Sequence, residues 1–109
     1  MIQPDVTSAA LYARASVEDH AGRDMQLRGL RELATKRGLF VPPDAEYVDA
    51  GHSGASLDRP ALGRLRQAVQ GGRYDVVLVF TLDRLARDET SAGILRREFK
   101  QAGARVECV

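Results

Sequence analysis

The chain has 109 residues, which is enough for one domain with a hydrophobic core and too few for two. Its formal net charge is only +1, so it lacks the overall basic charge of proteins that hold duplex DNA by electrostatics alone. A single cysteine excludes an internal disulfide and a thiolate metal cluster, and no apolar run is long enough to span a membrane, so we expect a cytoplasmic protein.

The first half of the chain predicts two strands and one helix after a loose leader over residues 1–8, which lacks the pattern of a signal peptide. A short apolar run over 9–13 predicts the first strand, and a polar loop is expected over 14–23. Leucines at helical spacing predict an amphipathic helix over 24–38, with a glycine at its end. A brief second strand is expected over 46–49.

The second half predicts a loop, two helices and two strands. Residues 50–58 are small and polar, and we interpret them as a functional loop. A helix with a proline in its first turn is expected over 59–70. The apolar run 75–80 predicts a central strand buried on both faces, 89–101 a helix, and 104–109 a last strand. This alternation indicates an α/β domain of three layers, with a central, mostly parallel sheet flanked by helices.

Charged side chains follow the strands at the edge of the sheet where the carboxyl ends of parallel strands meet, and ligands of such sheets bind there. The segment 82–87, Leu-Asp-Arg-Leu-Ala-Arg, follows the central strand, and Arg14 and Ser16 follow the first. Arginine suits phosphate because its planar fork binds two oxygens at once. The pattern therefore predicts a phosphate site. The residues that we expect at this rim are Arg14, Ser16, Asp49, Arg59, Asp83, Arg84 and Arg87.

Motifs of other phosphate and metal chemistries are absent from the sequence. It has no cluster of three carboxylates for a two-metal nuclease, no glycine-rich loop that ends in Lys-Ser or Lys-Thr, and no Gly-x-Gly-x-x-Gly after the first strand. His20 and His52 are isolated and do not predict zinc. We therefore expect no metal and no cofactor. Of the 16 basic residues, 14 are arginine. The codon bias of a GC-rich genome explains this number as well as a role in phosphate binding does, but it does not explain a cluster of arginines at strand ends.

Four motifs in order resemble the catalytic domain of serine site-specific recombinases, the resolvase/invertase family. Residues 12–16, Tyr-Ala-Arg-Ala-Ser, are similar to the family's Tyr-x-Arg-Val-Ser, and residues 82–87 to its Leu-Asp-Arg-Leu-x-Arg. Between them, Gln26 stands on the first predicted helix, and Asp49 is followed by Ser-Gly and then Arg-Pro over 53–60. The resemblance covers essentially the whole chain.

Four positions depart from the family's pattern. Ala15 replaces the usual valine, Val17 stands where a small hydroxyl residue is common, and residues 19–20 are Asp-His where the family often has glutamine. These departures concern loop contacts rather than the nucleophile.

The resemblance implies that Ser16 attacks a DNA phosphate, giving a phosphoserine intermediate and a free 3′ hydroxyl. Because the covalent bond conserves the energy of the phosphodiester, rejoining needs neither ATP nor metal. Asp83 would position the arginines or carry the proton of the leaving group, and Gln26 and Asp49 would support the site. The cationic pocket around the phosphate would consist of Arg14, Arg59, Arg84 and Arg87.

The resemblance also implies a longer protein. The family places an oligomerisation helix and a DNA-binding region after this domain, so we expect residues 9–109 to be a truncated catalytic domain. The full-length protein would act on DNA as a dimer or tetramer at paired recombination sites. We expect no membrane among its partners. The fragment alone is expected to be inactive in recombination.

Two other functions stay open. The chain could be a catalytically silent phosphate-binding or interaction module of the same fold, although its serine and four arginines argue against this. It could also be a phosphoesterase that releases phosphate from small esters through a serine intermediate. Single residues have structural explanations too: Ser16 as a turn residue, Asp83 as a cap, Arg87 as an ion-pair partner, and Tyr12 as core.

Overall fold

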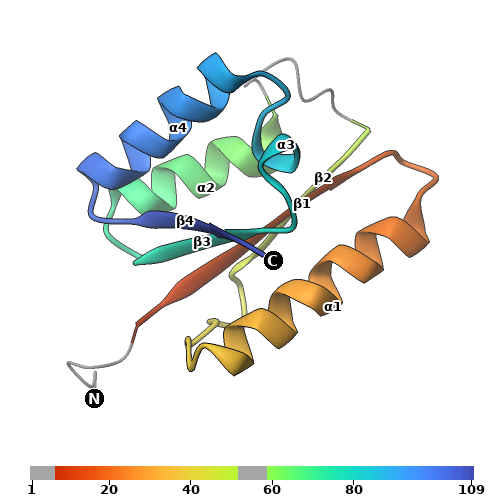
Figure 1. The fold of residues 1–109 in the computed structure, drawn as a ribbon, viewed down its shortest axis with the longest axis horizontal. Coiled ribbons are helices and arrows are strands. Elements are labelled where there is room, and N and C mark those ends of the chain that lie inside the picture. Colours follow the sequence, from red (N-terminus) through yellow and green to blue (C-terminus); the bar gives the residue numbers. More distant parts are fainter. Residues whose placement is uncertain (1–6, 52–58) are drawn as a thin grey trace.

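The computed structural model describes residues 7–51 and 59–109, so most of the expected leader and of the loop 50–58 lies outside the described residues. Four parallel strands form one sheet in the order β2-β1-β3-β4. Figure 1 shows β1 in the middle of the domain and β4 at the edge next to β3. The strands are β1 (Ala9–Ala15), β2 (Glu46–Ala50), β3 (Val76–Val79) and β4 (Arg105–Cys108).

Helices cover both faces of this sheet. Helix α1 (His20–Lys36) lies on one face, and α2 (Pro60–Gln70) and α4 (Glu89–Gln101) lie together on the other (Figure 1). The short helix α3 (Leu82–Leu85) follows β3 directly at its carboxyl end. The predicted three-layer α/β fold is therefore confirmed, and the sheet is parallel throughout.

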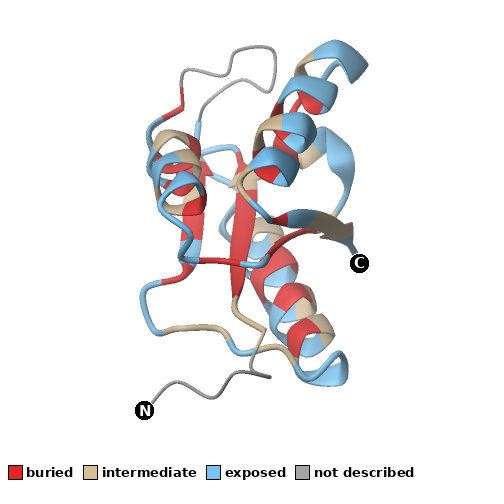
Figure 2. Ribbon diagram, turned by 90° about the vertical axis from the view of Figure 1, so that its left-hand side faces the viewer, coloured by how far each residue is buried: buried red, intermediate tan, exposed pale blue. Residues whose placement is uncertain are grey.

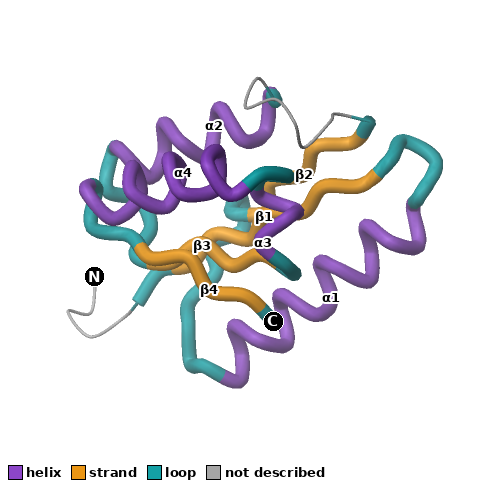
Figure 3. Tube along the Cα trace, turned by 45° about the horizontal axis from the view of Figure 1, so that its top comes forward, coloured by secondary structure: helices purple, strands orange, loops and turns teal. Residues whose placement is uncertain are grey.

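The core consists of two apolar layers, one on each side of the sheet. Every residue of β3 is buried, as Figure 2 shows for the centre of the molecule. Alternate residues of β1 face opposite sides, so Leu11 packs with Leu30 of α1, while Tyr12 packs with Leu62 of α2 and Phe99 of α4. The tube in Figure 3 shows this sheet between α1 and the α2–α4 pair.

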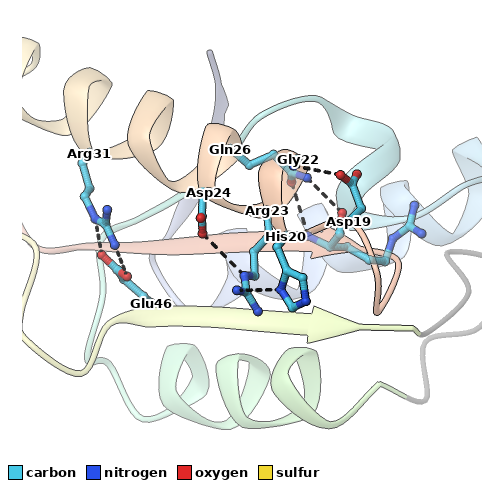
Figure 4. A network of polar contacts seen from close by, with 9 residues as sticks. Asp19, His20, Gly22, Arg23, Asp24, Gln26, Arg31 and Glu46 are labelled. Atoms are coloured by element: carbon cyan, nitrogen blue, oxygen red, sulfur yellow. Dashed lines mark hydrogen bonds and ion pairs between the residues drawn. The ribbon is translucent and has the colours of Figure 1, made fainter.

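Helix α1 begins four residues earlier than its leucine pattern indicates, which corrects the predicted start at Asp24. The cause is Asp19, whose Oδ1 accepts a hydrogen bond of 2.8 Å from the amide of Gly22 and so caps the helix (Figure 4). The predicted polar loop 14–23 is therefore confined to residues 16–19, because β1 extends to Ala15. At the other end, Gly38 adopts a φ of +67° just after the helix, as expected for a helix-terminating glycine.

An ion pair joins α2 to α4. Arg66 donates from Nε to Glu98 Oε2 at 2.9 Å and from Nη2 to Oε1 at 2.7 Å. This hydrogen bonding lowers the pKa of Glu98 below its ordinary value. The pair therefore stabilises the fold above the ordinary glutamate pKa of about 4.3, and this contribution disappears as the pH falls through the lower pKa of the folded state.

We expect Glu98→Gln to lower the free energy of unfolding by up to about 1 kcal/mol at pH 7 and by progressively less below about pH 4.3. Urea unfolding of both proteins between pH 7 and pH 3 measures this difference. Glu32→Gln, an exposed residue of α1, is the control. A Glu98 effect that grows on acidification would contradict the assignment.

The helices of the described ranges include none that is long and apolar enough to cross a membrane.

Candidate active site

The carboxyl ends of β1, β2 and β3 bring the predicted residues to one rim of the domain. In the register of the sheet, Arg14 of β1 stands opposite Asp49 of β2. Ser16 follows β1 immediately and is exposed, and α3 carries Asp83 and Arg84 just beyond β3. Three segments that are far apart in the sequence thus meet next to an exposed hydroxyl.

Arg14 and Arg84 fasten β1 to α3 in both directions. Arg14 donates from Nε to the carbonyl of Arg84 at 3.2 Å and from Nη2 to the carbonyl of Asp83 at 2.7 Å. In return, Arg84 donates from Nη1 to the carbonyl of Arg14 at 3.2 Å. Since Arg14 lies two residues before Ser16, this clamp fixes α3 beside the candidate nucleophile.

Gln26 ties α1 to the same point of β1. Its Oε1 accepts from the amide of Arg14 at 3.3 Å, and its Nε2 donates to the carbonyl of Arg14 at 3.1 Å. The side chain is only 1% exposed. It lies about two turns after the Asp19 cap of α1 (Figure 4), and its hydrogen bonds join α1 to the backbone of β1 at Arg14.

Asp49 is the centre of a buried hydrogen-bond network. Its Oδ2 accepts from the hydroxyl of Tyr12 at 2.7 Å. The carboxylate also accepts from the first amides of α2: Oδ1 accepts from Ala61 at 2.8 Å, and Oδ2 accepts from Leu62 at 3.0 Å. The carboxylate therefore caps α2 from a neighbouring strand and lies where the helix dipole favours an anion.

Arg59, the residue before α2, is also buried, with 1% of its surface exposed. Its Nη1 donates to the hydroxyl of Tyr12 at 3.0 Å and to the carbonyl of Arg84 at 3.2 Å, and its Nη2 donates to the carbonyl of Leu85. Helix α3 has too few residues to satisfy its own last carbonyls. Arg59 and Arg14 satisfy them instead, so two of the predicted arginines hold the segment that carries a third.

The positive charges at this rim are crowded. Burial lowers the pKa of Arg14 below its ordinary value, and the charges of Arg59 and then Arg84 lower it further. Asp83 is an anion at neutral pH, because a hydrogen bond from the Thr81 hydroxyl lowers its pKa and the nearby charges of Arg84 and Arg14 act in the same direction. Adjacent guanidinium groups with few carboxylates between them favour the binding of a further anion.

Two further features of the rim concern Arg84 and Arg87. The Nε atom of Arg84 is buried and has no hydrogen-bond partner among the described residues, an arrangement that is uncommon in folded proteins. Arg87 is exposed and lines a hollow of about 460 Å³ together with Asp83 and the start of α4. Within residues 7–51 and 59–109, no hydrogen bond or ion pair ties Arg87 to the other predicted site residues.

Two residues of the site were not predicted as such. Tyr12 is buried as expected for a core residue, but its hydroxyl links Asp49 to Arg59. Thr81 is the hydrogen-bond donor to Asp83. A threonine two residues before an aspartate is a signal for such a contact, whereas nothing in the sequence indicates where the Tyr12 hydroxyl points. The predicted Ser53 and Gly54 lie outside the described residues.

Metal ligands do not gather at this rim. In the part of the chain that the structure describes, no three histidine, cysteine, aspartate or glutamate side chains lie close enough to hold a metal ion. The carboxylate of Asp49 accepts hydrogen bonds from α2 and Tyr12, and that of Asp83 accepts one from Thr81.

The chain is similar to known proteins in both sequence and fold. The transposon Tn3 resolvase of Escherichia coli is 36% identical over 98 residues, which are 90% of this chain and 48% of the resolvase. The chain therefore spans about half the length of that relative.

Two solved structures share the fold. The N-terminal catalytic domain of TP901-1 integrase superimposes with a TM-score of 0.86 at 33% identity, covering 94% of this chain and 77% of that one. The C-terminal catalytic domain of ISC1926 TnpA, an IS607-like serine recombinase, gives a TM-score of 0.85 at 31% identity, covering 94% and 70%. The family model of the resolvase N-terminal domain matches residues 9–109. By sequence and by fold, the chain belongs to the resolvase N-terminal domain family.

Proposed function

We propose that the chain is the catalytic domain of a serine site-specific DNA recombinase that cleaves and rejoins DNA through Ser16. The observation that carries this proposal is the exposed Ser16 hydroxyl at a rim where the side chains of Arg14, Arg59 and Arg84 interlock around α3. Membership of the resolvase family supports DNA as the substrate. The full-length protein would act as a dimer or tetramer at paired sites, with its oligomerisation and DNA-binding regions outside residues 9–109.

In the proposed reaction, the Ser16 Oγ attacks the scissile phosphorus and gives up its proton. The bond from phosphorus to the 3′ oxygen breaks, and that oxygen takes a proton to become a free 3′ hydroxyl. The reverse attack by a 3′ hydroxyl of another strand releases the serine and restores the phosphodiester. Extra negative charge develops on the phosphate in the transition state, and the arginines would stabilise it without a metal.

The arginines are proposed to have two different roles, contact with the phosphate and positioning of α3. Arg87, which is exposed, and Arg84, which is half-buried, are the groups that would contact the phosphate. Arg14 and the buried Arg59 would hold α3 in place and add positive charge from below, where low dielectric strengthens it. Because the pKa of Asp83 is lowered, the ionised carboxylate is suited to positioning arginines rather than to donating a proton.

The test is covalent trapping of DNA by the protein at its natural length. Duplex fragments from the source genome are incubated with the protein in EDTA, the reaction is stopped with detergent, and protein-linked DNA is recovered. We expect adducts with a free 3′ hydroxyl that persist in EDTA. Phosphate binding without any adduct would instead indicate the silent module, and free phosphate released from small esters would indicate a phosphoesterase.

Arg84→Gln is expected to slow adduct formation by about 10²–10³-fold, the usual effect of removing one donor to a developing anion. The free energy of unfolding should change by less than about 1 kcal/mol, because the substitution also removes the buried Nε that lacks a partner. Adduct rates and urea unfolding measure the two effects. The control Arg64→Gln, on the exposed face of α2, should change neither. Equal adduct rates for Arg84→Gln and wild type would remove Arg84 from the phosphate pocket.

A further inference from the structure

A groove between α4 and the edge strand β4 is lined by positive side chains. It has a volume of about 420 Å³, and Gly93 and Val106 line it together with the charged residues. Figure 1 shows α4 running alongside β4, the last strand of the sheet. No acidic residue is among the described residues that line the groove, which we call the α4–β4 groove. Its charged residues are Arg96, Arg97, Lys100 and Arg105.

Three of the four cations of this groove form no ion pair with the described residues. Arg105 donates to Glu107 at 2.6 Å, as other arginines do to their own carboxylates. Arg96, Arg97 and Lys100 are exposed and form no ion pair with any residue of the described ranges. In a chain with a net charge of +1, three such cations lie within five consecutive residues of one helix, 96–100. Like charges at this spacing repel one another and attract a polyanion.

The groove is continuous with the candidate active site. It shares Gly93 and Arg96 with the neighbouring hollow, whose lining also includes Arg87 and three acidic residues, Asp83, Asp88 and Glu89. A chain of phosphates that enters the site beside Arg87 therefore meets Arg96, Arg97 and Lys100 as it continues along α4.

We propose that the α4–β4 groove binds the backbone of duplex DNA that flanks the scissile phosphate, independently of its sequence. The inference rests on the proposed function, which places a DNA phosphate at the rim, and adds a second contact surface to it. Residues 96–100 rise about 6 Å along α4. One strand of duplex DNA carries a phosphate for every 3.4 Å of its axis, so these three cations match two to three consecutive phosphates.

The experiment measures binding of the 109-residue chain to a fluorescent duplex of unrelated sequence at salt concentrations from 50 to 200 mM. One variant combines Arg96→Gln, Arg97→Gln and Lys100→Gln. The control variant combines Arg28→Gln, Lys36→Gln and Arg64→Gln. Both variants lose two arginines and one last-turn lysine from exposed helix positions, so net charge and the helix-dipole effect of the lysine are matched.

Phosphate contacts set the slope of log affinity against log salt at about 0.9 per contact, so we expect the groove variant to lose about 2 to 3 from the magnitude of this slope. Its affinity at 50 mM salt should fall at least tenfold, while the control variant stays within about twofold of wild type. Unfolding midpoints of all three proteins are compared first, and the single substitution Arg97→Glu provides a second test that alters one exposed side chain. It should lower the slope by about 1.

Three results would overturn the proposal. The first is an equal loss of DNA affinity in both triple variants, which would indicate an effect of net charge alone. The others are the absence of DNA binding by the wild type and tighter binding of a poly-aspartate peptide than of DNA. The proposed function fails separately, because a missing Ser16 adduct leaves the salt dependence of binding unchanged. Conversely, if the groove does not bind DNA, the proposed adduct of Ser16 is unaffected, because the trapping experiment tests it separately.

Discussion

Replacing Ser16 by alanine is expected to abolish the covalent protein–DNA adduct while leaving the fold intact. The hydroxyl is exposed and follows β1, so its removal leaves the core and the clamp between Arg14 and α3 unchanged. Without the Oγ atom no bond to phosphorus forms, and the arginines alone supply no nucleophile. Adducts recovered after detergent treatment should fall at least 10³-fold, to the background of the assay.

Ser8→Ala is the matched control for this substitution. Ser8 precedes the opposite, amino end of β1, far from the rim in the order of the strand. We expect this variant to form adducts at the wild-type rate. Adducts formed by Ser16→Ala at more than a few per cent of the wild-type rate would show that another residue is the nucleophile.

Replacing Asp49 by alanine is expected to lower the free energy of unfolding by about 3–5 kcal/mol. The substitution leaves the Tyr12 hydroxyl and the amides of Ala61 and Leu62 buried without their acceptor, and each such group costs about 1–3 kcal/mol. It also removes a negative charge from the surroundings of the buried Arg59. A small domain has only about 5–15 kcal/mol of stability in total, so this loss is large.

The control for Asp49 is Asp44→Ala. Asp44 forms an ion pair of 2.9 Å with Arg73, but both side chains are about half exposed or more, so we expect a change below about 1 kcal/mol. Urea unfolding followed by circular dichroism measures both variants. A loss at Asp49 no larger than that at Asp44 would mean that the carboxylate does not organise α2 and Tyr12 as described.

Most elements of the fold follow from local patterns. The uninterrupted apolar run of β3, the proline in the first turn of α2 and the leucine spacing of α1 and α2 are strong signals, and the structure places these elements close to the predicted ranges. Local patterns did not indicate two features of the fold. The early start of α1 depends on a single capping side chain, Asp19, and α3 is only one turn long, which is too short to show a helical period.

The place of the candidate residues in the fold could be predicted, but the burial of their side chains could not. The order of parallel strands brings Arg14, Asp49 and the segment after β3 to one edge, and this follows from the sequence pattern. The burial of Arg59 could not be predicted in the same way, because it depends on a long side chain reaching the carbonyls of Arg84 and Leu85 from another element. For the same reason, the hydroxyl of Tyr12 was predicted only as part of the core.

Mass spectrometry of the trapped adduct identifies the residue that attacks the phosphate. After digestion of the DNA and the protein, we expect a nucleotide joined by its 5′ phosphate to the peptide that contains Ser16, with fragmentation placing the added mass on that serine. The same modification on any other peptide, or a nucleotide joined through its 3′ phosphate, would show that Ser16 does not cleave DNA as proposed.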